Sequence, residues 1–174
     1  MLVCQKQSRS HMQTKVLIDQ IRKKCSRSLK LSDQELGALI DKFEVYSVES
    51  TSSREEVLFE QQFKDMIGVL GNYFIGKRMF ETMLQWRARH NEPKQSRYIK
   101  LVDYVEYSDM IYNGSQEEKD RISFMMLDMR GQGKIDFHSY EKFWINFLYM
   151  YGELLQVKMH YNADSEELTR QTFN

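Results

Sequence analysis

The chain has 174 residues, with 25 basic and 25 acidic side chains and a formal net charge of zero. A hydrophobic content of 41% is enough to bury the core of one domain or of a pair of lobes. No apolar run reaches the roughly 18 residues of a membrane span, and the first residues do not resemble a secretory signal, so we expect a cytoplasmic protein. Two cysteines and four scattered histidines form no zinc pattern, and no glycine-rich phosphate loop or nucleophile elbow is present. These absences favour a protein that is not an enzyme.

Residues 1–31 are predicted to form a basic N-terminal helix and a linker. We expect the helix to pack on the following lobe with its basic side in solvent. Contact with a membrane surface, or recognition as a calmodulin-type target, is the alternative. Nucleic-acid binding is not expected, because the basic stretch is short and lacks interleaved aromatic residues. The basic residues are Lys6, Arg9, Lys15, Arg22, Lys23, Lys24, Arg27 and Lys30, and the apolar side is formed by Val16, Leu17, Ile18, Ile21, Cys25 and Leu29.

Residues 32–112 are predicted to contain four helices. Ser32 and Glu35 have the spacing of a capping box, which marks the start of the first. The other three are expected at residues 57–70, 78–86 and 102–112, and Gly71 or Gly76 would end or bend the second. The apolar face of the first helix is Leu36, Leu39, Ile40 and Phe43.

Two further helices are predicted on either side of a turn that begins at Asp128. Gly114 ends the preceding element, and Ser115 with Glu118 forms a second capping box. Phe124 and Leu127 give the entering helix its inner face. The exiting helix carries apolar and aromatic residues at helical spacing, namely Tyr140, Phe143, Trp144, Phe147 and Leu148.

The turn itself has the spacing of a calcium-binding EF-hand loop. Counting from Asp128, the turn glycine falls on Gly133, the apolar eighth position on Ile135 and the ninth position on Asp136. The third position is Arg130, whose charge opposes a divalent cation, and the twelfth is a serine where a bidentate glutamate is expected. We therefore expect the loop geometry to be kept and calcium or magnesium to bind weakly or not at all. The candidate ligand positions are Asp128, Gln132, Lys134, Asp136 and Ser139.

Several short motifs lie between residues 79 and 155. They are Met79-Phe80, Asp103-Tyr104, the run Gly-Ser-Gln-Glu-Glu-Lys at 114–119, and Phe124 with Asp128. This pattern resembles the second and third hands of four-hand calcium sensors of the neuronal calcium sensor, calcineurin-B and calcium-regulated NADPH oxidase type. The resemblance implies an EF-hand fold and a regulatory role through partner helices. It does not extend to calcium binding, because the ligand positions depart from the pattern.

The predicted fold is all-α, with EF-hand-like helix-loop-helix pairs, short β-bridges between loops and an additional N-terminal helix. Residues 32–112 would form a first, degenerate pair, and residues 113–174 a third unit with a truncated fourth. The bridge residues are expected to be Leu58, Ile99 and Ile135. The ligand positions of the first two loops are poor: Thr51, Ser53, Glu55 and Gln62 in the first, and Glu92, Lys94, Ser96 and Asp103 in the second.

The C-terminal part resembles the entering helix of a fourth hand, capped by Asp164 or Ser165 and containing Leu168 and Phe173. Without a paired fourth loop, the aromatic side of the helix around 143–155 would need cover. We expect it to contact a partner, a neighbouring chain or the tail. The candidate partner-binding residues are Trp144, Phe147, Leu148, Tyr151 and Leu155.

These patterns favour a non-catalytic, largely calcium-insensitive regulatory or scaffolding module that binds an amphipathic helix of a protein partner. Two other hypotheses remain open. One is a genuine calcium sensor with a weak site at the Asp128 loop. The other is the N-terminal regulatory part of a larger calcium-regulated enzyme or channel.

Overall fold

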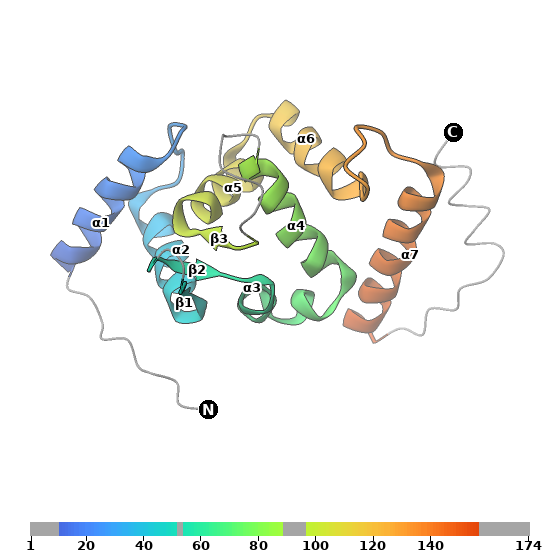
Figure 1. The fold of residues 1–174 in the computed structure, drawn as a ribbon, viewed down its shortest axis with the longest axis horizontal. Helices are drawn as coiled ribbons and strands as arrows, with labels where there is room; N and C mark the ends of the chain where they lie inside the picture. Colours follow the sequence, from blue (N-terminus) through green and yellow to red (C-terminus); the bar gives the residue numbers. More distant parts are fainter. Residues whose placement is uncertain (1–10, 52–53, 89–96, 157–174) are drawn as a thin grey trace.

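The computed structural model describes residues 11–51, 54–88 and 97–156 (Figure 1). These residues form seven α-helices, one 3₁₀ helix and a three-stranded antiparallel sheet, which confirms a mostly helical protein with a small β component. The helices are α1 (His11–Lys24), α2 (Asp33–Tyr46), α3 (Glu60–Ile67), η1 (Gly68–Asn72), α4 (Phe74–Ala88), α5 (Leu101–Asn113), α6 (Gln116–Leu127) and α7 (Phe137–Leu154). The strands are β1 (Val48–Glu49), β2 (Glu56–Leu58) and β3 (Ile99–Lys100).

Both predicted capping boxes are present. At the start of α2, the Glu35 N–H donates to Ser32 Oγ at 3.3 Å, and the Ser32 N–H donates to the Glu35 carboxylate at 2.8 Å. Ser115 and Glu118 repeat the arrangement at the start of α6, with distances of 3.2 and 2.8 Å. These reciprocal bonds satisfy backbone donors that the first helical turn leaves without a partner.

The second predicted helix begins later and ends earlier than the sequence pattern indicated. Val57 and Leu58 belong to β2 and are fully buried, and α3 starts at Glu60. Gly68, whose φ is +66°, ends α3. A buried β-branched residue is well suited to a sheet, so burial against β3 outweighs the helical spacing of the residues that follow. The neighbouring helices agree better. Helix α5 nearly coincides with residues 102–112, and α4 extends the predicted helix 78–86 at both ends, more at the N-terminal one.

The sheet joins two segments that the sequence predicts as loop bridges. Leu58 pairs with Ile99 between β2 and β3, as predicted. Strand β1, which the sequence analysis did not predict, pairs with β2 so that Val48 lies opposite Val57. The expected bridge at Ile135 is wrong: this residue is half-buried and belongs to none of the strands formed by the described residues. Ile135 immediately precedes the N-cap of α7, where the chain already turns into the helix.

Two apolar clusters hold the helices together. The larger one includes Leu58 and Ile99 from the sheet, and also Phe63 and Phe80, whose ring centroids are 5.7 Å apart. The second cluster lies where α1 meets α2 and α5, so the N-terminal helix packs on the rest of the protein as expected. Its buried members are Ile18, Ile21, Leu31, Leu36, Ile40 and Val105.

Helices α1 and α7 lie at opposite ends of the molecule (Figure 1). Helix α7 packs alongside α4 and α6. Near the C-terminal end of α7, Glu153 accepts a hydrogen bond of 2.9 Å from the Tyr73 hydroxyl. The two helices that carry the predicted interaction residues and the basic charge are therefore far apart.

Candidate functional site

The loop between α6 and α7 is closed by the carboxylate of Asp128. This side chain is buried, and its two oxygens accept hydrogen bonds from the backbone N–H groups of Gln132 at 3.0 Å and Gly133 at 2.7 Å. Gly131 and Gly133 have φ angles of +63° and +74°, a region that favours glycine. Gly133, which the sequence analysis identified as the turn glycine, therefore has a backbone conformation that suits this position. Asp128 thus fixes a tight turn through contacts within the loop.

The second carboxylate of the loop, Asp136, is the N-cap of α7. It accepts from the Ser139 N–H at 3.0 Å and from the Ser139 hydroxyl at 3.0 Å, and the Arg130 guanidinium lies 3.8 Å away. The Ser139 N–H is the main cause that holds the pKa of Asp136 below its usual range, and the Ser139 hydroxyl and Arg130 act in the same direction. Asp136 is therefore used to start a helix and to pair with a cation of the chain itself.

The five predicted ligand positions do not converge as a set of acidic groups. Gln132 and Lys134 are exposed, and Ser139 is engaged by Asp136. Across residues 11–51, 54–88 and 97–156, no three histidine, cysteine or acidic side chains are grouped so that they could hold a metal ion. The predicted positions Glu92, Lys94 and Ser96 of the second loop lie outside the described residues, as do Ser53 of the first and the capping residues Asp164 and Ser165.

A cation from another helix supports the start of the loop. Arg78 of α4 is only 2% exposed. Its guanidinium donates to the carbonyl oxygens of Met125 at 2.7 Å, Met126 at 3.1 Å and Asp128 at 3.5 Å. These carbonyls belong to the last turn of α6 and its C-cap, where a positive charge is favourable. The sequence gives no indication of this contact, because nothing local distinguishes Arg78 from the exposed arginines.

Aromatic rings form a continuous row along α7. Phe143 stacks on Phe147 with centroids 6.4 Å apart, and Phe147 stacks on Tyr151 at 6.3 Å. Trp144 packs edge-on against Phe147 at 5.5 Å, and its Nε1 is buried without a hydrogen-bond partner among the described residues. The spacing of these residues places them on adjacent turns of one side of the helix.

The candidate partner-binding residues divide into two groups. Trp144, Phe147 and Leu148 are half-buried, whereas Tyr151 and Leu155 are 51% and 56% exposed. Tyr149 and Leu154, which the sequence analysis did not select, are exposed too. The exposed apolar surface is therefore concentrated in the C-terminal half of α7.

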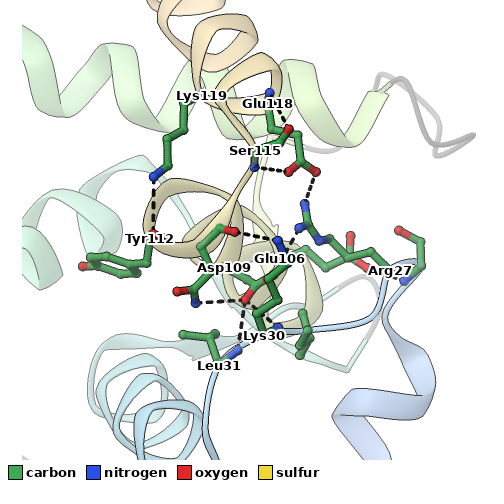
Figure 2. A network of polar contacts seen from close by, with 12 residues as sticks. Arg27, Lys30, Leu31, Glu106, Asp109, Tyr112, Ser115, Glu118 and Lys119 are labelled. Carbon is green, nitrogen blue, oxygen red and sulfur yellow. Dashed lines mark hydrogen bonds and ion pairs between the residues drawn. The ribbon is translucent and has the colours of Figure 1, made fainter.

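A polar network joins the linker between α1 and α2 to α5 and α6 (Figure 2). Asp109 of α5 is fully buried and accepts hydrogen bonds from the N–H groups of Lys30 at 2.9 Å and Leu31 at 3.1 Å. Arg27 lies 3.3 Å from Asp109 and 2.6 Å from Glu118. Glu106 accepts from the Ser26 N–H. The network fixes the linker in place. The sequence analysis predicted only the capping role of Glu118 and no contact of Glu106 or Asp109.

A search against protein-family models finds no match for this chain, and a search of curated proteins finds no significant similarity. Within the described part of the chain, no helix is long and apolar enough to cross a membrane.

Proposed function

We propose that the protein is a non-catalytic, EF-hand-like cytoplasmic module that binds an amphipathic helix of a protein partner and does not require calcium. The observation that carries the proposal is the aromatic surface of α7. Helix α7 packs on α4 and α6, yet Tyr151 and Leu154 on its last turns and Leu155 at its C-cap remain exposed, and their helical spacing places them on one side. Exposed aromatic and aliphatic groups of this kind are typical of protein-binding surfaces.

The arrangement of the helices supports the EF-hand-like interpretation. Helices α2 and α3 flank one loop and α4 and α5 flank the next, and these two loops meet through the antiparallel pair of β2 and β3. Helices α6 and α7 flank the Asp128 loop, which has a glycine with positive φ at the sixth position. The module would then contain one paired unit followed by a third helix-loop-helix unit.

The contacts of the Asp128 loop support calcium insensitivity. Asp128 uses both carboxylate oxygens on backbone N–H groups, and Asp136 is paired with Ser139 and Arg130. A calcium ion would have to compete with these contacts in a loop with only two acidic groups. Because ligand charge tunes affinity in such loops, we expect calcium to bind more weakly than about millimolar.

Calorimetric titration with calcium tests this part of the proposal. The matched control is Asp128→Ala, which removes the first ligand position. A micromolar dissociation constant that disappears in Asp128→Ala would favour the calcium-sensor hypothesis instead. The titration should be accompanied by circular dichroism, because Asp128 also closes the turn.

Binding by α7 can be measured through Trp144. The chain has two tryptophans, so Trp86→Phe leaves Trp144 as the single emitter. A synthetic amphipathic helix of leucine and lysine is a suitable probe, titrated once with calcium and once with EDTA. We expect the same shift in Trp144 emission in both buffers, because the exposed end of α7 lies within one to three turns of this ring.

Two variants in that background identify the surface. Tyr151→Ala/Leu155→Ala removes exposed apolar groups of α7 and should abolish the shift while leaving the helical circular dichroism unchanged. Tyr112→Ala, which removes a tyrosine that is 67% exposed on α5, should bind like the parent. Absence of any shift in the parent, or a shift that needs calcium, would contradict the proposal.

Trp144→Ala separates a role of this ring in the interface from a role in the core. Because this variant lacks the Trp144 signal, its binding is followed with a label on the leucine-lysine helix. If Trp144→Ala folds but no longer binds this helix, Trp144 lies in the interface. Loss of helical structure would place it in the core. In that case the exposed residues Tyr151 and Leu155 alone would form the contact.

A further inference from the structure

Helix α1 covers an apolar surface formed by α2 and α5. Ile18 and Ile21 of α1 are only 4% and 2% exposed, and they pack against Leu36, Ile40 and Val105, which are fully buried. The opposite side of α1 faces solvent, since Met12 and Val16 are exposed. A short aliphatic stripe thus holds α1 on a surface that would otherwise be open.

The surroundings of α1 are complementary to it in charge. Lys15 lines an open groove together with Asp33 and Asp41 of α2. On the other side of α1, Lys24 lines a second groove with three carboxylates and one cation, Lys100, which is paired with Glu55 at 3.2 Å. The carboxylates are Glu55, Glu56 and Asp103. Arg22 is paired with Asp33 at 2.9 Å. The site that receives α1 is therefore apolar along its centre and has more carboxylates than cations at both edges.

The linker and the helix are attached in different ways. The linker residues Arg27, Lys30 and Leu31 are bound by the buried carboxylate of Asp109, as Figure 2 shows. Helix α1 itself depends on the aliphatic stripe and on Arg22, which also donates to the Leu31 carbonyl at 2.7 Å. A displaced α1 would thus remain tethered at the edge of its own site, where it would compete with any other ligand at a high effective concentration.

We propose that the surface beneath α1 is a second protein-binding site, which takes a basic amphipathic helix of a partner when α1 is displaced. The expected partner helix has the same features as α1, which fills the site in this structure. These features are two aliphatic residues at helical spacing, as Ile18 and Ile21 are, and a lysine on each flank, as Lys15 and Lys24 are. The proposal goes beyond the α7 surface, because it concerns the opposite end of the molecule (Figure 1). Helix α1 acts as a built-in competitor that lowers the apparent affinity of the site.

The probe for this site is a fluorescent synthetic peptide with the sequence of α1, residues 11–24, titrated into the full-length protein. Ile18→Ala/Ile21→Ala weakens the internal helix and leaves the α2 and α5 surface unchanged. This variant should bind the peptide about tenfold or more tightly than the parent does, because the open fraction of the site increases. The matched control is Met12→Ala/Val16→Ala on the exposed side of α1, which should bind like the parent.

Peptide variants test the chemistry of the occupant. A peptide with Lys15→Glu and Lys24→Glu keeps the aliphatic stripe but opposes the carboxylates at the edges of the site, and it should bind the Ile18→Ala/Ile21→Ala protein about tenfold more weakly. Equal binding of the two peptides would overturn the assignment of a basic partner. Equal binding of the unmodified peptide to the parent and the alanine variant, or binding to neither, would overturn the site itself.

A disulfide lock gives an independent test, which remains valid if the alanine variant loses its fold. A Cβ added at Gly37 of α2 would lie 3.9 Å from Thr14 Cγ2 of α1, so Thr14→Cys/Gly37→Cys is placed to form a disulfide. In a Cys4→Ser background, the oxidised protein should bind the peptide at least about tenfold more weakly than the reduced protein. Equal binding in both redox states would overturn the proposal, and failure of the disulfide to form would contradict the contact of α1 with α2.

These outcomes are separate from those of the α7 experiments. The leucine-lysine helix is detected through Trp144 and depends on Tyr151 and Leu155, whereas the α1 peptide depends on Ile18, Ile21 and the disulfide lock. Failure at one end of the molecule leaves the result at the other end unchanged.

Discussion

Replacement of Arg78 by methionine tests whether a buried cation of α4 supports the end of α6. In the parent, the guanidinium donates to the Met125 and Met126 carbonyls at 2.7 and 3.1 Å, and to the Glu81 carboxylate at 2.5 Å. Arg78→Met keeps a similar volume but leaves buried carbonyls without these donors. Hydrogen bonds to a charged group contribute about 1.5–3 kcal/mol each, and the partial exposure of Glu81 lets water compensate for part of the loss. We expect the free energy of unfolding to fall by about 3 kcal/mol.

Urea-induced unfolding followed by circular dichroism measures this change, with the slope of the transition expected to stay constant. The matched control is Arg121→Met on α6. Arg121 is exposed, and its guanidinium lies 5.5 Å from the centroid of the Trp86 ring. That cation–π contact contributes about 0.5–1 kcal/mol. Equal losses in the two variants, or a loss below about 1 kcal/mol for Arg78→Met, would refute the assigned role of Arg78.

Two further predictions concern single residues. Gly133→Val should destabilise the protein by more than about 1 kcal/mol, and the positive φ of Gly133 is the whole cause, because an added Cβ meets no atom within 4 Å. Thermal unfolding measures the change, and Gly37→Ala is the control, expected to be neutral or stabilising. An unchanged melting temperature of Gly133→Val would contradict the prediction. Burial, together with the nearby carboxylates of Glu106 and Asp109, raises the pKa of Cys25 from 9.0 to about 12. In a Cys4→Ser protein at pH 8, a disulfide reagent should therefore label Cys25 about a hundredfold or more slowly in the folded state than in the unfolded state. Equal labelling of the folded and unfolded states would show that Cys25 is accessible. The raised pKa of Cys25 also contributes to the stability of the fold; this contribution is complete below pH 9 and is lost as the pH rises toward 12.

The features that the sequence predicted well are local ones. The capping boxes at Ser32 and Ser115 depend on residues three positions apart, and the positive φ of Gly133 follows from the spacing of one turn. The pairing of Leu58 with Ile99 was predictable because each is an apolar residue at an equivalent position of two successive loops. In each case a local pattern carries the prediction, even where the two residues that pair, Leu58 and Ile99, are far apart in the sequence.

The features that were missed depend on contacts between distant segments. Asp109 and Leu31 are 78 positions apart in the sequence, and no local pattern shows that this carboxylate is buried. Similarly, β1 forms because its neighbour β2 is held against β3, and Arg78 reaches the end of α6 only after α4 and α6 have packed. Burial of a polar group is decided by the tertiary arrangement, so it cannot be inferred from the residue type alone.

The contacts of the Asp128 loop bear on how the α7 surface would be displayed. Arg78 fixes the end of α6, the Asp128 carboxylate closes the turn, and Asp136 starts α7. Each contact joins groups of the chain, so in this structure α6 and α7 are held in place by the protein's own side chains and backbone. If calcium does not bind to this loop, as proposed, it has no difference in binding energy between two arrangements of the helices, and a ligand without such a difference shifts no equilibrium. Under the proposed function, the aromatic surface of α7 would therefore be presented permanently, and regulation would have to act elsewhere, at the displaceable helix α1.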